Sequence, residues 1–565
     1  MKKNLALYIG LVFVLVALVS AIVLSVPTFG GKVVSFDSTY GKKNVTLKGT
    51  YWEVKGSEYA VLVCPGYSCD REKWRPMANL FVGNGLTTMT FDYAGQGAST
   101  GTIGFDNAKT DAIPVEISDA IEKLHELSGI PYEKIILVGH SLGGRSILRL
   151  LYDYNNPNAV TTVPKRNIKN VILFSAAVNY YFNAQASLFA GTTDEAESPW
   201  DVFGASDVAD SNVYLFGSTA DDIVFDEDVL AMYNRLGGSA PQSGMFEGSV
   251  INNFGSKITV RVSNLLLHSY MMFSPKYAVY TNEALSEITG APASYPAARI
   301  FLTYVSWISA LVGLGFVFFS LTRGAKEPAN DSIPVITDMK AFLLRKLFLW
   351  LPGIAMAFVV CCICVVMPFG SPIMNIPYMC FIAGYGLVML LAYRKGLFKG
   401  TEGRLPRPSF QIAAKGCELA KAIVITVVSC AFVWFVLWCT MYRLIPLNVR
   451  LFWVVFASVL MAVGYYISGV ENDMLDSANA SAKVRFLYNL IQYVALFLFV
   501  LFYLVIKSYS GLIGQIQNMI LMYIFCIPLG DYLRRKTSNR LVGAVVTAFL
   551  FQTLMITSAA LISFF

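Results

Sequence analysis

The sequence contains little charge. Only 14% of its 565 residues are Asp, Glu, Lys or Arg, whereas soluble domains average about 25%. Ten cysteines are too few for a disulfide-stapled scaffold, and 39 Phe, 30 Tyr and 8 Trp are too many for a disordered chain. A soluble protein, a disordered protein and a disulfide-rich protein are therefore excluded as descriptions of the whole chain.

Motifs for several ligands are also missing. The sequence has no phosphate-binding G-x-x-x-x-G-K-[ST] loop, no Cys/His spacing of the kind that binds zinc, and no basic patch typical of nucleic-acid binding. We therefore expect no metal, no cofactor and no nucleic acid among the ligands. No motif points to a protein partner.

Long apolar runs divide the chain into three zones. Residues 5–26 form an uncharged run of 22, which is enough to cross roughly 30 Å of hydrocarbon. This run is longer than the apolar region of a secretory signal, so residues 1–26 are predicted to be an uncleaved transmembrane anchor. Residues 27–298 have an ordinary composition that predicts a globular domain. Residues 299–565 are predicted to form an all-α membrane domain of about eight transmembrane helices.

The charges predict which side of the membrane each zone faces. The eight expected C-terminal spans lie near 300–321, 347–367, 376–393, 422–442, 451–470, 486–506, 512–532 and 541–564. If the N-terminus is cytoplasmic, the cytoplasmic segments hold 20 Lys and Arg, and the opposite loops of the membrane region hold 4. Positive loops stay in the cytoplasm. We therefore predict a multi-pass protein of the cell membrane with its globular domain outside the cytoplasm.

The strongest chemical signal is GHSLGG, residues 139–144. It follows the apolar run KIILVGH and precedes the helical pattern RSILRLLYDY, so it is predicted to join a strand to a helix. A G-x-S-x-G sequence in this context is typical of a nucleophile elbow, in which small residues two before and two after the serine allow a sharp turn. Gly139 and Gly143 occupy those places around Ser141, the predicted nucleophile.

A serine nucleophile needs a base and an acid later in the chain. Of the three histidines, only His268 follows the elbow, so we predict that it is the base. The segment SNVYLFGSTADDIVF is typical of a strand that ends in an acidic loop, and Asp221 fits the acid better than Asp222, which we interpret as a loop or capping residue. DDIVFDEDVL also has the pattern of a capped helix start. The oxyanion hole needs two backbone N–H groups, predicted at Leu142 and Tyr67.

These segments together resemble a known family. CPGYSCDREKW, TMTFDYAGQGASTG, ILVGHSLGG, LFGSTADD and LLLHS are similar to the α/β-hydrolases, especially their lysophospholipase, monoacylglycerol-lipase and esterase branch. The resemblance covers about residues 33–290 and implies a mostly parallel sheet flanked by helices. Two features depart from it. Pro65-Gly66 replaces the usual His-Gly of the oxyanion loop, and residues 178–211 give no familiar lid pattern.

The other polar and sulfur-containing groups suggest structural roles. Most cysteines lie in predicted spans, where they behave as small apolar residues. Cys64 and Cys69 could pair in an exported domain, but Cys64 ends a predicted strand, which favours free thiols. Asn489 and Gln492 lie three apart in a span, and we interpret them as helix-packing residues rather than a transport path.

The sequence thus predicts a membrane-anchored, extracytoplasmic serine hydrolase (carboxylesterase- or lipase-like). Its substrate is expected to be an ester or thioester of small-molecule or lipid-like acyl character, since the site is held near membrane lipid. Two alternatives remain open. The eight C-terminal spans also suit a transporter or receptor-like protein whose hydrolase-fold domain only binds, and the same triad cleaves amides in serine peptidases.

Overall fold

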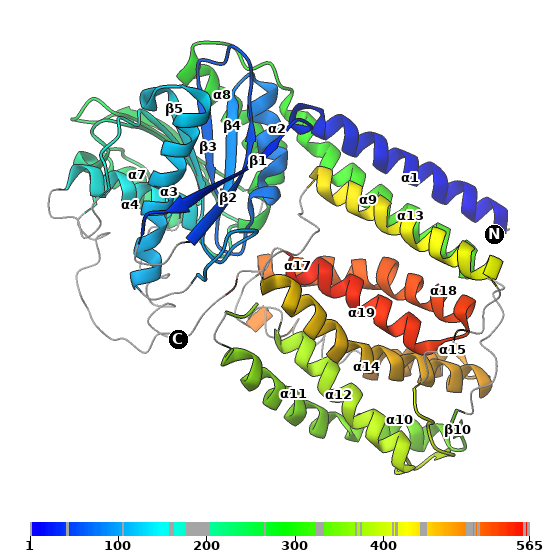
Figure 1. Ribbon diagram of the computed structural model, residues 1–565. Helices are drawn as coiled ribbons and strands as arrows, with labels where there is room; N and C mark the ends of the chain where they lie inside the picture. The colour runs from blue at the N-terminus through cyan, green and yellow to red at the C-terminus, as the bar shows by residue number, and fades with distance from the viewer. Residues whose placement is uncertain are drawn as a thin grey trace.

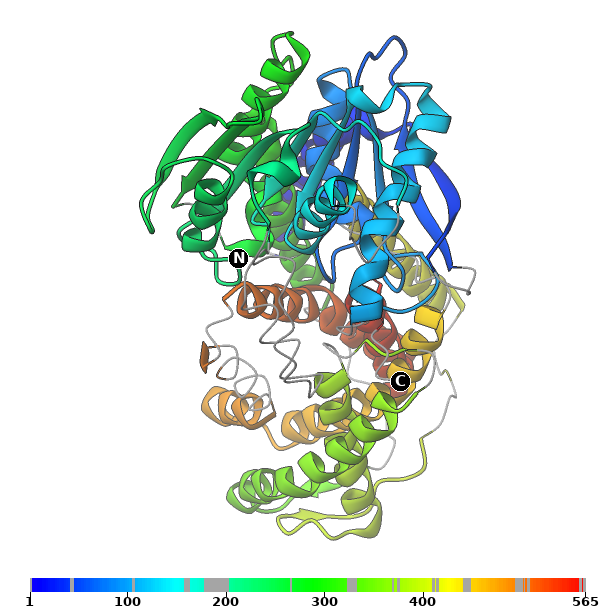
Figure 2. The same cartoon turned by 90° about the vertical axis from the view of Figure 1, so that its left-hand side faces the viewer.

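The structure is a computed structural model of one chain. It describes residues 3–40, 45–103, 107–156, 163–176, 203–264, 267–322, 333–367, 370–372, 376–408, 412, 416–440, 449–492, 501, 504–505, 509–557 and 561. An α/β unit and a group of long helices lie next to each other (Figures 1 and 2).

A nine-stranded sheet forms the centre of the α/β unit. The strands are β1 (Lys32–Ser38), β2 (Val45–Trp52), β3 (Ala60–Cys64), β4 (Thr87–Asp92), β5 (Ile135–His140), β6 (Asn170–Phe174), β7 (Asn212–Ser218), β8 (Phe246–Ile251) and β9 (Lys257–Ser263). Their order is β1-β2-β4-β3-β5-β6-β7-β9-β8. Neighbouring strands from β4 to β9 pair in parallel, whereas β1 and β2 at one edge and β8 at the other pair antiparallel.

Helices cover both faces of this sheet. Alternate strand residues point to opposite sides, and in the central strands both sets are apolar and buried beneath helices. In β5, Ile135 and Leu137 belong to the core beneath α3 (Asn107–Ser128), α4 (Leu142–Asn155) and α7 (Asp226–Arg235). Ile136 and Val138 belong to the core beneath α2 (Arg75–Gly83) and α8 (Pro275–Thr289). The fully buried central strands explain the near-continuous apolar runs of the sequence. This mostly parallel sheet between helices is an α/β-hydrolase fold, as predicted.

The remaining helices lie in the N-terminal and C-terminal parts of the chain, and most of them are apolar. They are α1 (Lys3–Ser25), α9 (Leu302–Thr322), α10 (Met339–Phe348), α11 (Trp350–Val365), α12 (Ile376–Lys395), α13 (Gly416–Thr440), α14 (Val449–Ser477), α15 (Ala482–Gln492), α17 (Tyr509–Leu521), α18 (Ile527–Thr537) and α19 (Arg540–Ile556). A π-helical segment, η7 (Met522–Cys526), joins α17 to α18. Figure 1 shows α1 running beside α9 and α13.

Six helical segments within the described residues are long and apolar enough to cross a membrane. They are Leu5–Thr28, Ala297–Thr322, Met339–Cys364, Gly416–Thr440, Val449–Ser477 and Leu512–Thr537, and each coincides with a predicted span. The predicted span 376–393 corresponds to α12, the span 541–564 contains the shorter helix α19, and much of the span 486–506 lies outside the described residues. These helices are consistent with a membrane protein, and the total of nine spans stays a prediction.

Specific contacts join the α/β unit to the long helices. The Arg75 guanidinium donates a hydrogen bond to the Trp438 carbonyl at 2.8 Å and lies 3.9 Å from the centre of the Trp438 ring. On the other side, Arg450 at the start of α14 is fully buried and donates to the Gly95 carbonyl at 2.7 Å. Gly95 also accepts from the Leu561 N–H at 2.9 Å. The loop after β4 is therefore held by the helical part of the chain.

Candidate active site

Ser141 lies on a sharp turn between β5 and α4. Its backbone has φ 52° and ψ −116°, and residues other than glycine seldom adopt such a positive φ. The Ser141 N–H donates to the Phe174 carbonyl of the neighbouring strand at 3.0 Å, which fixes the turn at the carboxyl end of the sheet. The predicted nucleophile elbow is therefore present as a strained strand-to-helix turn.

The glycines around Ser141 are required by close backbone contacts. A Cβ on Gly143 would lie 2.1 Å from the Cys64 carbonyl oxygen, and one on Gly139 would lie 2.7 Å from the Gly144 Cα. Real Cβ atoms do not approach other atoms so closely. The first turn of α4 is thus pressed against the end of β3, which brings the loop after β3 beside the serine.

The predicted acid and base are hydrogen-bonded to each other. His268 begins the 3₁₀ helix η5 (His268–Phe273), and its Nδ1 lies 2.9 and 3.1 Å from the two carboxylate oxygens of Asp221. Asp221 Oδ1 also accepts from the N–H groups of Ile223 and Val224 at 2.9 and 2.8 Å. Both side chains are buried. The loop after β7 therefore holds the carboxylate in one orientation and presents it to the imidazole.

Asp221 is ionised in this environment. Burial opposes ionisation, but the adjacent His268 ring and the hydrogen bonds to the carboxylate outweigh it, so the pKa of Asp221 lies below its usual value. A carboxylate at this position accepts a hydrogen bond from Nδ1–H and leaves the Nε2 lone pair of His268 free to act as a base. The neighbouring Asp222 meets the backbone of the base instead, because its Oδ1 accepts from the His268 N–H at 3.3 Å.

The serine follows β5 and the histidine follows β9, and their side chains are not joined by a hydrogen bond in the described part of the chain. Among the described residues, the Ser141 hydroxyl makes no hydrogen bond to His268. Such contacts are often loose before substrate binds. Ser141, Asp221 and His268 all lie at the carboxyl edge of the parallel strands, where α/β folds place their sites. Their catalytic roles stay a prediction.

The two predicted oxyanion donors border the same turn. Leu142 is the first residue of α4, so its N–H belongs to the helix N-terminus, where backbone donors and the helix dipole favour negative charge. A Cβ on Gly66 would lie 3.3 Å from Ser141 Cβ, so the loop that carries Tyr67 touches the nucleophile turn. The geometry suits a donor at Tyr67, and that role stays a prediction.

His140 has a role that the sequence analysis missed. Its Nε2 lies 3.0 Å from the His268 carbonyl oxygen, and its ring centre lies 4.6 Å from that of His268. Burial, and then the neighbouring His268 ring, lower the pKa of His140 to about 3. His140 is therefore neutral, and because a carbonyl only accepts, its Nε2 carries the proton. His140 therefore positions the backbone of the predicted base. The sequence does not reveal this role, because it does not show that His140 and His268 are in contact.

A buried ion pair joins the segment after β3 to the end of β4. Asp92 Oδ1 accepts from the Arg71 N–H at 2.7 Å, Asp92 Oδ2 accepts from the Ala98 N–H at 2.9 Å, and the carboxylate is paired with the Arg71 guanidinium. A Cβ on Gly97 would lie 2.2 Å from Asp92 Cγ, which explains this glycine of the FDYAGQGAST turn. Gln96 Oε1 accepts from the Cys69 N–H at 3.1 Å. The turn after β4 therefore fixes the turn after β3.

Three remaining expectations are resolved or fall outside the structure. Cys64 and Cys69 are both buried free thiols, in agreement with the favoured interpretation. The helix start predicted within DDIVFDEDVL is present, because α7 begins at Asp226, and Asp221 lies in the loop before it, where its carboxylate accepts from the Ile223 N–H. Most of the stretch 178–211, which has no familiar lid pattern in the sequence, lies outside the described residues.

A comparison with protein families agrees with this fold. A family model described as alpha/beta hydrolase fold matches residues 59–202. The esterase Pf2001 of Pyrococcus furiosus is 18% identical, with 46% of this chain and 91% of the esterase covered at a TM-score of 0.32. A thermostable carboxyl esterase from Bacillus coagulans is 13% identical (46% and 98% covered, TM-score 0.32), and mouse alpha/beta hydrolase domain-containing protein 10 is 15% identical (46% and 98%, TM-score 0.30). No curated protein matches the chain.

Proposed function

We propose that the protein is a membrane-anchored serine hydrolase that cleaves an ester or thioester outside the cytoplasm. The observation that carries this proposal is the bonded Asp221–His268 pair at the same sheet edge as the strained Ser141 turn. The acyl group is expected to be lipid-like, because the turn after β4 and the start of α2 contact the long apolar helices.

The reaction has two steps. Ser141 Oγ attacks the substrate carbonyl while His268 Nε2 takes its proton, and the N–H groups of Leu142 and Tyr67 stabilise the developing oxyanion. The carbonyl bond to the leaving alcohol or thiol breaks, and His268 returns the proton to that group. Water then attacks the acyl-enzyme with His268 as base, which releases the acid and restores Ser141.

Hydrolysis by the purified full-length protein tests the proposal. We expect turnover of p-nitrophenyl butyrate that falls at least a thousandfold in Ser141→Ala, because the residual rate without the nucleophile comes from binding and the oxyanion hole alone. Ser146→Ala is the matched control. Ser146 is a buried serine of α4, the helix that follows Ser141, and its hydroxyl donates to the Leu142 carbonyl at 2.7 Å.

The same assay separates the two alternatives. If the protein binds the ester and the hydrolysis rate is the same background rate for wild type and Ser141→Ala, the α/β unit would be a binding module of a transporter or receptor-like protein. Faster cleavage of the matching anilide than of the ester would support a serine peptidase.

A further inference from the structure

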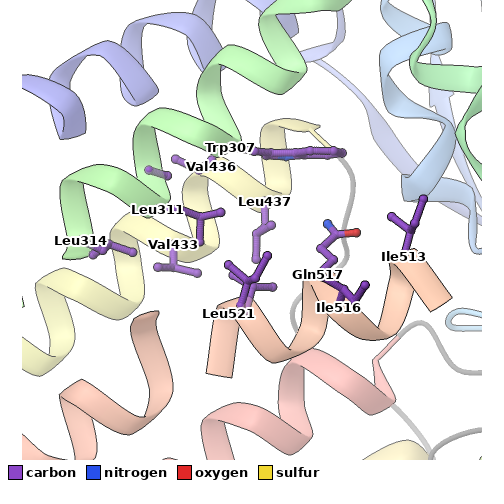
Figure 3. Close-up of a pocket in the computed structure, with 12 residues that line it drawn as sticks. Trp307, Leu311, Leu314, Val433, Val436, Leu437, Ile513, Ile516, Gln517 and Leu521 are labelled. Carbon is purple, nitrogen blue, oxygen red and sulfur yellow. The ribbon is translucent and has the colours of Figure 1, made fainter. Parts of the chain in front are cut away.

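An apolar cavity lies between α9, α13 and α17, on the side of these helices nearest the α/β unit (Figure 3). Its volume is about 170 Å³. Its walls are aliphatic except for Trp307 and Gln517; the aliphatic residues include Leu311, Leu314, Val433, Leu437, Ile516 and Leu521. Figure 3 shows the side chains of α17 directed toward those of α9 and α13. A water molecule would find almost no hydrogen-bond partner there.

The size and chemistry of the cavity suit a hydrocarbon chain. An engineered apolar cavity of about 150 Å³ in another protein stays dry and binds benzene, so about 170 Å³ has room for a segment of roughly six carbons. Ile513, Ile516 and Ile520 line the cavity and are still 37–40% exposed on the outside of the helices. Because these helices are long and apolar enough to span a membrane, that opening faces lipid.

The cavity is connected to the candidate active site through aromatic contacts. Trp307 lines the cavity, and its ring packs edge-on against Phe273 with 5.4 Å between ring centres. Phe273 ends η5, the short 3₁₀ helix that begins with His268. Helix α17 also packs against η5. At about 2 Å of rise per residue, His268 lies only about 10 Å along η5 from the residue that contacts the cavity wall.

The orientation of Trp307 is fixed. Its indole Nε1–H donates to the Thr440 hydroxyl at 2.8 Å, and its ring also packs edge-on against Tyr304 at 5.8 Å. The indole therefore lines the cavity and contacts η5 in one fixed orientation. A chain in the cavity would lie against the same side chain that packs on the short helix of the predicted base.

We propose that the cavity between α9, α13 and α17 holds the distal part of a long acyl chain whose carbonyl carbon is attacked by Ser141. The inference rests on the proposed function and names its substrate class, a long-chain lipid ester that enters from the bilayer. The transmembrane helices are then part of the substrate site, which explains why the enzyme has more of them than an anchor requires.

A bifunctional probe tests both statements separately. The probe is a fluorophosphonate on a long alkyl chain with a diazirine at the far end, applied to the full-length protein in lipid nanodiscs, irradiated and mapped by peptide mass spectrometry. We expect phosphonylation of Ser141 together with tail adducts in α9, α13 or α17. Tail adducts confined to the α/β unit would overturn the inference and leave the proposed function intact. Absence of reaction at Ser141 would overturn both.

Chain-length selectivity gives an independent readout. Ile516→Trp replaces an aliphatic side chain of the cavity wall by a larger indole ring at a partly exposed position. Ile308→Trp is the matched control, because Ile308 is a 61% exposed residue of α9 that does not line the cavity. Each buried methylene is worth about fourfold, so excluding two of them lowers the ratio of kcat/KM for dodecanoyl over butyryl ester about 15-fold. We expect that loss only in Ile516→Trp. An unchanged ratio in this variant would contradict the inference, and if the variant fails to fold, the tail adducts decide.

Discussion

Replacing Asp221 by Asn removes the charge that holds the His268 tautomer. In Asp221→Asn, the amide oxygen of the new side chain can still accept from the N–H groups of Ile223 and Val224, at the present 2.9 and 2.8 Å, so the loop should keep its shape. The amide NH₂ then faces His268 Nδ1, which becomes the acceptor and moves the ring proton to Nε2. In that tautomer the imidazole cannot take the Ser141 proton.

The expected loss is large. The same change in another Ser-His-Asp enzyme lowers kcat about 10⁴-fold, which corresponds to roughly 5.5 kcal/mol of transition-state stabilisation. We expect a loss of this order in kcat for p-nitrophenyl butyrate, with little change in the thermal unfolding midpoint. Asp222→Asn is the matched control, because an amide oxygen can still accept from the His268 N–H as Asp222 does at 3.3 Å. It should stay within a few-fold of wild type.

Two results would refute this reasoning. If Asp221→Asn kept more than a tenth of the wild-type kcat, the carboxylate would not control the base. If Asp222→Asn lost activity and Asp221→Asn did not, the acid would have been assigned to the wrong neighbour. Fluorophosphonate labelling rates, which need the same base but no deacylation, provide a second measurement for both variants.

Two further predictions concern stability. Burial raises the pKa of Glu116 to about 8, so the folded state holds a proton that the unfolded state releases above about pH 4.3. The unfolding free energy should therefore fall as pH rises from about 5 to 8, by at most about 1.4 kcal/mol per pH unit. Glu116→Gln should flatten that slope in pH-dependent melts. In the helices, Lys346 and Glu471 form a buried ion pair, and the Glu471 carboxylate also accepts from the Tyr393 and Tyr488 hydroxyls at 2.8 Å. Glu471→Ala leaves the Lys346 charge unpaired and should cost about 3–5 kcal/mol of unfolding free energy, whereas Lys346→Met combined with Glu471→Leu should cost clearly less. A pH-independent stability, or additive losses in a double-mutant cycle, would contradict these two statements.

The sequence was sufficient for the fold and for the local part of the site. The G-x-S-x-G turn is a short-range feature, because its steric demand involves only residues next to Ser141 and the strand before it. His268 was found by elimination, since no other histidine follows the elbow. Asp221 was predicted from its place after a strand, and its bond to His268 agrees with that choice.

Contacts between distant segments were beyond the sequence. Nothing in the neighbourhood of His140 indicates that its ring meets the His268 carbonyl, 128 positions later. In the sequence, Arg450 is only one of the four basic residues counted in the extracytoplasmic loops, yet it is fully buried against Gly95 of the α/β unit. Lys346 and Glu471 likewise lie at the borders of predicted spans, where charges normally reach solvent, and only the packing of α10 against α14 and α15 shows them to be buried together.

The central claim is that Ser141 is a reactive nucleophile on the outer side of the membrane. The most direct measurement treats intact cells that make the full-length protein with a membrane-impermeant fluorophosphonate and maps the adduct by mass spectrometry. We expect an adduct on Ser141 in intact cells and none in Ser141→Ala. An adduct that forms only after the cells are permeabilised would contradict the orientation, and equal labelling of wild type and Ser141→Ala would contradict the mechanism.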